Sequence, residues 1–483
     1  MKYLIVIASF IILASGVYTG ASFGFTEEAA ENFKNNVLPY IFSKQENIQL
    51  PNQHINTGRG VFKVTFSITE TYIYDLNMDV TNSKVNFGSN NDIILNIADL
   101  SEKVRFTWSY DSNLGSDKGF AIVSLADTLA TTIIHLSAEN GRPVVSITEM
   151  TLKIGNLDVK FSGNTSADVA NWLVGILNQQ MIALIEKLTS DSLKDAIDTE
   201  LNQYLSSLDL TIDIGGIGLA INYTLPYPPI VTENFIQVDT LGLIVLKSNP
   251  NLSPPIDPPV QLPGFQETGL QIQAYITDYT FNSGFYAAYQ SGSLSTVITQ
   301  SDLPSQIKLT TTFLNDFLPG IVKVYGPNKP CQLNCSATEA PVVHTQSSNK
   351  LFPHGQIVGA IVTGCSVVVI NQGTAVELDM NLDFNATLYI DNWVLNGDLS
   401  WMQVTSLKAV NNNIDPIDTE GLMDGINFLL NMTLPTLNQR IFGQGLPLPK
   451  SQYVNLTMSD VTVENGYTYI QSTPQYNFTD NEN

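Results

Sequence analysis

The sequence contains few residue patterns that could support catalysis or bind a metal ion. Four histidines stand far apart, at His54, His135, His344 and His354, and their spacing matches no zinc-binding set. None of the motifs G-x-S-x-G, H-E-x-x-H, C-x-x-C or the P-loop occurs. The sequence therefore predicts a protein that is not an enzyme, with no catalytic residues, no bound metal and no cofactor.

Disulfide formation is the covalent chemistry that the sequence does favour. The chain has three cysteines, Cys331, Cys335 and Cys365. Cys331 and Cys335 lie in a segment that alternates like a β-strand, where they would be about 13 Å apart, too far for a disulfide. We expect a cross-strand bond from Cys365 to Cys331 or Cys335, and three buried thiols are the alternative.

The charge balance excludes one large class of partners. The formal net charge is −23, and charged residues make up only 14% of the chain, against about 25% in ordinary soluble proteins. Nucleic acids bind to clustered Lys and Arg, so we expect no nucleic-acid partner. For the same reason an anionic membrane is disfavoured as a partner, while transient contact with a lipoprotein or membrane surface stays open.

The N-terminus is typical of a secretory signal peptide. Lys2 precedes an apolar segment from Leu4 to Ala14, and small residues follow it. We expect cleavage after Gly16 or Ala21, which makes the mature protein secreted and extracellular. An uncleaved signal anchor is the alternative, but the apolar segment is shorter than the about 20 residues that span a bilayer.

Asn-x-Ser/Thr sequons agree with secretion and predict glycosylated surface positions. In an Asn- and Thr-rich chain some sequons arise by chance, so they support the secretory route without proving it. The predicted sites are Asn164, Asn222, Asn334, Asn385, Asn431, Asn455 and Asn477.

A proline-rich segment, residues 248–265, lies near the midpoint of the chain and contains six prolines. Proline fixes φ and lacks a backbone donor, so this segment can be neither a helix nor a central strand, and we expect extended polyproline II structure. We interpret it as a linker. The signal peptide, residues 1–21, is then followed by an N-terminal domain, residues 22–247, and by a C-terminal domain, residues 266–483.

The two halves show a similar order of predicted elements. In the first half a helix begins at Thr26 and should kink or stop near Pro39, alternating strands fill residues 62–161, and a long helix covers residues 165–208. In the second half the pattern predicts strands, a helix, a meander, a second helix and closing strands, over residues 268–294, 301–321, 322–410, 419–443 and 452–473. The pattern indicates a structural duplication.

Two segments of the second half resemble the BPI/LBP/CETP-like lipid-binding family. The first directly follows the proline-rich segment, and the second is the closing segment, where a helix leads to two strands. The residues that carry the resemblance are Tyr279, Phe281-Asn282-Ser283, Tyr289, Gly292-x-Leu294 and Gly445-Leu446-Pro447-Leu448-Pro449. The resemblance implies an α+β fold, a boomerang of two tandem antiparallel barrels, each closed by a long helix and joined by a central sheet and the proline-rich linker. It also implies an apolar, lipid-binding pocket in each barrel.

The sequence departs from this family in two ways. The family usually has a disulfide in its first half, and this chain has no cysteine there. Members that bind lipopolysaccharide carry a cationic tip on the first barrel, whereas the candidate tip loops here offer only Lys84, Lys103, Arg105 and Lys118. We therefore do not transfer lipopolysaccharide binding to this chain from the resemblance alone.

Apolar stripes on the predicted helices are the candidate lipid-binding residues. Such a stripe is usually ordinary core, and the resemblance is what favours contact with acyl chains. The candidates in the first barrel are Phe33, Val37, Ile41, Trp172, Leu173, Ile176, Leu177, Met181, Ile185 and Leu188. Those in the second are Leu309, Phe313, Phe317, Leu318, Ile426, Phe428, Leu429 and Leu430.

These observations lead to three hypotheses about function. The first is a secreted lipid-binding or lipid-transfer protein that holds phospholipid-like acyl chains, one pocket per barrel. The second is an extracellular defence protein that recognises lipopolysaccharide or another microbial lipid. The third is a duplicated scaffold whose pockets are filled by its own side chains and which binds other proteins.

Overall fold

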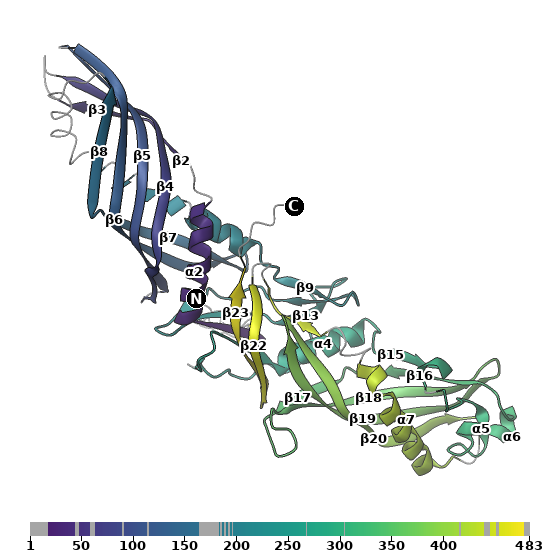
Figure 1. Cartoon of the computed structure of the whole chain (residues 1–483). Coiled ribbons are helices and arrows are strands. Elements are labelled where there is room, and N and C mark those ends of the chain that lie inside the picture. Colours follow the sequence, from purple (N-terminus) through teal and green to yellow (C-terminus); the bar gives the residue numbers. More distant parts are fainter. Residues whose placement is uncertain are drawn as a thin grey trace, which may run out of the picture. The chain divides into compact units, whose positions relative to one another are not determined.

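The computed structural model (Figure 1) shows a chain built mainly of long antiparallel strands. It describes residues 18–43, 48–57, 63–88, 91–113, 115–163, 183, 186–187, 190–191, 194–195, 197–266, 268–303, 305–414, 417–438, 445–450 and 454–477. The chain divides into two compact units. The N-terminal unit is Phe25–Leu208, Pro228–Gln237 and Tyr476–Asn483, and the C-terminal unit is Met1–Gly24, Asp209–Tyr227 and Val238–Gln475.

The N-terminal unit contains a curled antiparallel sheet of order β2-β4-β5-β6-β7, in which β3 also pairs with β4 and β8 with β6. Its strands are β2 (Ile48–Leu50), β3 (Gln53–Thr57), β4 (Val64–Phe87), β5 (Asp92–Ser112), β6 (Gly115–Glu139), β7 (Arg142–Lys153) and β8 (Asn156–Gly163). The predicted alternation places apolar side chains on one face, around the buried Phe106 and Trp108.

Irregular residues curl this sheet. Glu70, Asp75, Asp99 and Asp127 have left-handed backbone conformations, with φ between 49° and 53°. The β4–β5 and β5–β6 registers shift beside them. Such bulges bend a strand and increase its twist, so strands of more than 20 residues wrap round an interior.

Helix α2 (Glu27–Ser43) packs on the N-terminal sheet. The hydroxyl of Thr26 accepts a hydrogen bond from the Ala29 amide at 3.1 Å, as expected of a helix N-cap. Of the two outcomes expected at Pro39, a stop was wrong, because the helix continues through it to Ser43, and a kink stays a prediction. Residues 197–206 form a second helix here, and most of the predicted long helix lies outside the described residues.

The C-terminal unit contains a second curled sheet, of order β15-β16-β18-β19-β20-β21, with β17 also paired to β18. Its strands are β15 (Ser295–Ile298), β16 (Cys331–Ala337), β17 (Val342–Gln346), β18 (Gln356–Val369), β19 (Gly373–Asp391), β20 (Val394–Asn412) and β21 (Leu446–Pro447). The helices of this unit are α4 (Asp278–Gln290), α5 (Thr311–Leu314), α6 (Ile321–Tyr325) and α7 (Thr419–Leu437), with a 3-10 turn at Gln300–Asp302.

Shorter strands complete both units. A further sheet has the order β12-β1-β14-β23-β22. Its strands are β12 (Phe235–Thr240), β1 (Ala21–Thr26), β14 (Ile272–Thr277), β23 (Tyr467–Tyr476) and β22 (Val454–Glu464). A three-stranded sheet has the order β13-β10-β9, formed by β13 (Leu243–Leu246), β10 (Leu219–Asn222) and β9 (Thr211–Ile214). In the N-terminal unit, β11 (Ile230–Val231) pairs with Ile236 and Gln237.

The predicted strands over residues 278–290 were wrong, since this segment is helix α4. Its aromatic residues suggested a strand, but the small residues Thr280, Ser283 and Ala287 recur at helical spacing and form its buried face. The correction strengthens the predicted duplication, because α4 follows β14 directly just as α2 follows β1. The helix predicted over 301–321 is instead a 3-10 turn followed by α5 and the start of α6.

The proline-rich segment forms no helix or strand over residues 253–265, as predicted. Its end packs within the C-terminal unit. The ring of Phe265 stacks on Tyr275 of β14 at a centroid distance of 4.9 Å, and a side chain at Gly24 would collide with the Phe265 ring. The role of this segment as a linker between the domains 22–247 and 266–483 stays a prediction.

The backbone just before β1 is held by several hydrogen bonds in the C-terminal unit. The Gly20 carbonyl accepts from the Thr277 amide at 2.9 Å, from the Thr277 hydroxyl at 2.9 Å and from the Thr280 hydroxyl at 3.0 Å. The Thr240 hydroxyl donates to the Ala21 carbonyl. A signal-peptide cleavage after Ala21 would remove Gly20 and leave the buried Thr277 and Thr280 hydroxyls without this acceptor.

We therefore predict that cleavage occurs after Gly16, so that the mature chain begins at Val17. Mass spectrometry of the N-terminal peptide of the secreted protein checks this. A mature N-terminus at Ser22 would contradict the prediction and would mean that the contacts of Gly20 are dispensable.

Candidate functional site

A cavity of about 420 Å³ lies inside the C-terminal unit, enclosed by the curled sheet and by helices. Alternate residues of the strands point into it, as the two-residue period of a strand requires. The strand residues of its wall are Ser295, Thr296 and Ile298 of β15, Leu333, Cys335 and Ala337 of β16, Ile361, Thr363, Cys365 and Val367 of β18, Leu378, Met380, Leu382 and Phe384 of β19, and Leu399 and Met402 of β20. Natural ligand pockets span about 300–1,000 Å³, so the volume fits a small lipid.

Helix α7 forms the opposite wall with one apolar stripe. The lining residues recur at helical spacing and are Leu422, Gly425, Ile426, Leu429, Leu430, Thr433 and Leu437. Asp418 caps the helix, since its carboxylate accepts from the Gly421 amide at 3.0 Å. Close packing explains the glycine at position 425, because a side chain there would collide with the ring of Phe317.

Two asparagine amides fix α7 along β20, the strand beside it in Figure 1. Asn427 Oδ1 accepts from the Val404 amide at 2.7 Å, and Asn427 Nδ2 donates to the Val404 carbonyl at 3.4 Å. Asn438 makes the same pair of bonds to Leu399, at 2.6 and 3.2 Å. These bonds satisfy backbone groups on a side of β20 that pairs only at Val394 and Leu395 with β21.

Among the described residues, those that line the cavity carry no ionisable side chain. Its polar members are all hydroxyl residues, Ser293, Ser295, Thr296, Thr363 and Thr433, and the rest are apolar apart from the disulfide. A site of this composition cannot transfer protons or hold a metal ion. It can bind an apolar molecule by burying it away from water.

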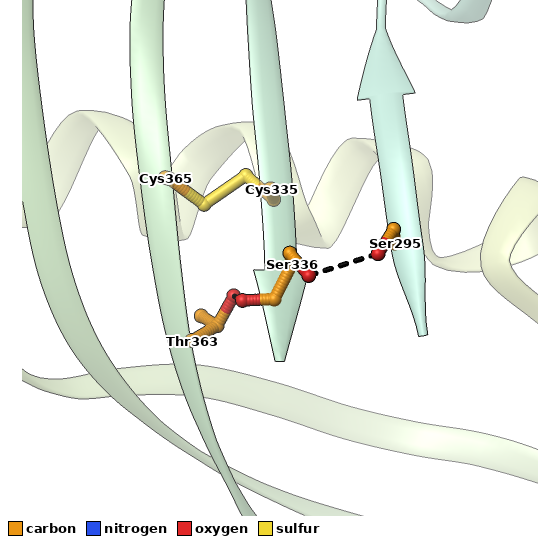
Figure 2. The surroundings of a disulfide bond; sticks show 5 residues. All are labelled: Ser295, Cys335, Ser336, Thr363 and Cys365. Atoms are coloured by element: carbon orange, nitrogen blue, oxygen red, sulfur yellow. Dashed lines mark hydrogen bonds between the residues drawn. A yellow bond between two sulfur atoms is a disulfide. The ribbon is translucent and has the colours of Figure 1, made fainter. Parts of the chain in front are cut away.

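Cys335 and Cys365 form a disulfide in the wall of this cavity (Figure 2). The two residues are directly opposite each other in the β16–β18 register, with Cα atoms 4.1 Å apart. Of the two pairings expected from the sequence, this is the one with Cys335. Cys331 is a buried free thiol, and burial raises its pKa to about 11, so it remains protonated at neutral pH.

The candidates in the second barrel divide into two groups. Phe317, Leu318, Ile426, Leu429 and Leu430 line the cavity. Leu309 is buried in the surrounding core and Phe313 packs against it, but neither lines the cavity. Phe428 points away from the cavity, and 55% of it is exposed. Contact of the first group with a lipid stays a prediction.

The candidates in the first barrel are mostly outside the described residues. Phe33 and Val37 of α2 belong to a core cluster of the N-terminal unit, together with Leu38, Ile97 and Ile134. The backbone of Ile41 lies in α2, but its side chain is not described. The remaining candidates, Trp172, Leu173, Ile176, Leu177, Met181, Ile185 and Leu188, lie outside the described residues.

Sequence reasoning missed several residues of the wall. Phe285 lines the cavity from α4, which we had expected to be a strand. Leu422, Thr433 and Leu437 extend the α7 stripe in both directions. Their spacing from Ile426 and Leu430 is a multiple of a helical turn, so a longer periodic window would have found them.

The other predicted features are placed as follows. Asn431, Asn455 and Asn477 are exposed, whereas Asn222, Asn334 and Asn385 are half-buried and Asn164 lies outside the description. Within the described part of the chain, no group of three or more His, Cys, Asp or Glu is arranged to hold a metal ion. No helix in that part is long and apolar enough to span a membrane.

Comparison with known proteins places the chain in a family. Residues 34–208 match the model of the "LBP / BPI / CETP family, N-terminal domain", and residues 218–476 match that of the "LBP / BPI / CETP family, C-terminal domain". The chain belongs to the LBP/BPI/CETP family. Members of this family are lipid-binding proteins rather than enzymes. The resemblance found in the sequence is thereby confirmed.

Several LBP/BPI/CETP relatives match over most of their length. The chain is 26% identical over 412 residues to "Lipopolysaccharide-binding protein" of Mus musculus, covering 83% of this chain and 82% of that one. It is 23% identical to "Bactericidal permeability-increasing protein" of Rattus norvegicus, covering 76% and 75%. The crystal structure of a lipopolysaccharide-binding protein aligns with 96% of this chain and 100% of its own at 20% identity, with a TM-score of 0.61. This match confirms the α+β fold with two curled antiparallel sheets.

The position of the disulfide leads to a prediction about stability. Replacing both Cys335 and Cys365 with Ala should lower the free energy of unfolding by about 2–4 kcal/mol, because the bond closes a loop of 30 residues. Urea denaturation without reductant measures this change. Cys331→Ala is the matched control and should cost only about 1 kcal/mol. Equal losses in both proteins would contradict the prediction.

Asp278, the first residue of α4, provides a prediction about pH. Burial raises the pKa of its carboxyl group, although hydrogen bonds from Thr345 and the nearby His344 oppose the shift. A raised pKa in the folded state means that stability falls as pH rises from about 4 through the folded-state pKa. Asp278→Asn removes this titration while an amide oxygen can still accept from Thr345. The stability of wild type relative to Asp278→Asn should therefore decrease from pH 4 to pH 7 in urea titrations, and a constant or rising difference would contradict this.

Proposed function

We propose that this protein is a secreted lipid-binding protein that carries an acyl chain in the cavity of its C-terminal unit. The observation that carries the proposal is the composition of that cavity, which is apolar and free of charged side chains in a chain of net charge −23. Membership of a lipid-binding family supports it.

The energetics of burial favour such a ligand. Each methylene group moved from water into an apolar site gains about 0.8 kcal/mol. A long hydrocarbon chain therefore gains more than it loses by becoming ordered, since immobilising a flexible group costs only about 0.5–1.5 kcal/mol. A dry cavity of about 420 Å³ would otherwise leave its walls without van der Waals partners.

The duplication extends the proposal to the N-terminal unit. There, α2 follows β1 and packs on a curled sheet, as α4 follows β14 in the C-terminal unit. A second pocket would lie between that sheet and the helices, with Phe33, Val37 and the predicted helical residues 172–188 in its wall. Transfer of lipid between surfaces would then be the task of the protein.

Several features support secretion and glycosylation. A disulfide between two strands persists in oxidising compartments and is rare in the cytosol. The N-terminal residues fit a signal peptide, and Asn431, Asn455 and Asn477 are exposed sequons that a secretory pathway could modify.

Recognition of lipopolysaccharide is the second candidate, favoured by the names of the relatives. The described charges of the N-terminal unit give it little electrostatic support. Lys103 donates to Asp75 at 2.6 Å, and Lys160 lies 3.2 Å from Asp158, so both cations have acidic partners. Arg105 lies over the ring of Phe120, with its guanidinium carbon 5.5 Å from the centroid. Lipopolysaccharide would therefore have to bind mainly through its acyl chains.

Substitutions on α7 test the lipid site. Ile426→Asn places an amide in the cavity wall and should reduce the amount of co-purified or reloaded lipid by more than about tenfold, because the amide would be buried without a partner. Native mass spectrometry of the full-length protein before and after delipidation measures the bound mass.

Phe428→Asn is the matched control, since it lies on the same helix, does not line the cavity and is exposed. It should bind lipid like wild type. Circular dichroism melting curves confirm that both variants are folded. Equal lipid loading in folded Ile426→Asn and wild type would remove this cavity as the site.

A further inference from the structure

The cavity of the C-terminal unit differs from a general lipid pocket in its volume and in the chemistry of its opening. An apolar cavity of about 150 Å³ accommodates one benzene molecule. By that scale, about 420 Å³ has room for roughly 15–20 carbon atoms. This amount of carbon is one long hydrocarbon chain, and two such chains would need about twice the volume.

The exposed residues of the cavity lining are Ser293, Ser295 and Thr296, and the last two belong to β15, the edge strand of the sheet, so we place the opening of the cavity along β15. Thr296 is directly opposite Cys335 in the β15–β16 register, and Cys335 points into the cavity. The side chain of Thr296 therefore shares the inner face of the sheet. Thr296 is nevertheless exposed, so solvent reaches the inner face at this point.

The groups around this opening are hydroxyls. Thr363 of β18 is opposite Ala337 of β16, lies on the same inner face and is buried. Its hydroxyl donates to the Ser336 carbonyl at 2.9 Å, which leaves its oxygen able to accept. The Thr296 hydroxyl has no hydrogen-bond partner among the residues that the structure describes. The opening thus offers both a donor and an acceptor to a bound molecule.

No described residue that lines the cavity carries a charge. A carboxylate or phosphate group that reached the buried Thr363 would lose water without gaining a Lys or Arg partner, which is costly for a charged group. An alcohol or a glycerol ester loses much less and can exchange hydrogen bonds with Thr296 and Thr363.

Resting on the proposed lipid-binding function, we infer that this cavity takes a single-chain lipid with an uncharged polar end, such as a long-chain alcohol or a monoacylglycerol. The chain lies between β18, β19 and α7, and the polar end lies at Thr296. The ligand class thus differs from both a free fatty acid and a phospholipid with two chains.

The test uses the full-length secreted protein after delipidation. Monopalmitoylglycerol, hexadecanol, palmitate and dipalmitoyl phosphatidylcholine each compete with a fluorescent acyl probe, and native mass spectrometry gives the stoichiometry. Binding that is lost in Ile426→Asn but kept in Phe428→Asn is assigned to this cavity. We expect the two neutral single-chain lipids to bind it at least about tenfold more tightly than palmitate or the phospholipid. Palmitate or the phospholipid binding this cavity as tightly as the neutral lipids would overturn the inference.

Thr296→Lys tests the position of the polar end. A cation at the opening should increase the affinity for palmitate about tenfold and leave that for hexadecanol nearly unchanged. Thr296→Gln is the control for side-chain length without charge, and both substitutions are at an exposed position that tolerates them. No gain of palmitate affinity in Thr296→Lys would show that the polar end lies elsewhere. If none of the four lipids binds in an Ile426-dependent way, the proposed function itself fails, which is distinct from a wrong head group.

Discussion

Attachment of helix α7 to one edge of a curled sheet is the constraint on which the cavity depends. Asn427 and Asn438 bind both backbone groups of Val404 and Leu399, so the helix lies along β20. A helix held this way cannot move across to β15 at the other edge of the sheet. The apolar stripe of α7 then faces strands that curve away from it, and the side chains between them do not fill the space. In an ordinary core, the helix would move closer to the sheet until the side chains filled this space.

The two units reach a similar arrangement from different sequences. In each half of the chain, a short strand leads directly into a helix, and a meander of long strands follows. In the N-terminal unit, acidic residues with left-handed backbones produce the curl, as at Glu70 and Asp127. In the C-terminal unit, register shifts in the β19–β20 pairing accompany it. Both sheets therefore need to be curved, but different residues produce the curvature in each.

Much of the architecture could be predicted from the sequence because strand alternation is a strong local signal. The long strands β4 to β8 and β16 to β20 fall where the two-residue period placed them. Helix α4 could not be predicted in this way, since its aromatic residues favour a strand and its buried face consists of small residues, Thr280, Ser283 and Ala287. The helix is stabilised by close packing of this small face, for example where Gly284 contacts Ile244. Such tertiary packing overrides local propensity and cannot be read from it.

The cavity itself was harder to predict than its helix. The stripe of α7 was evident, and Ile426, Leu429 and Leu430 do line the cavity. Phe428 was included because it is large and apolar, yet it is on the outer face of the same helix, 55% exposed. Periodicity separates these positions only when the phase of the helix is known, and the phase is fixed here by Asn427 and Asn438, whose role depends on the distant strand β20.

The disulfide strengthens the side of the sheet that the asparagines do not hold. The bond from Cys335 to Cys365 joins β16 to β18 beside the edge strand β15. β15 pairs over only four residues, from Ser295 to Ile298, and has β16 as its sole neighbour in the sheet order. Strands at an edge separate most easily, since they are bonded on one side only. A covalent bond at β16 therefore keeps the strand that supports β15 in place.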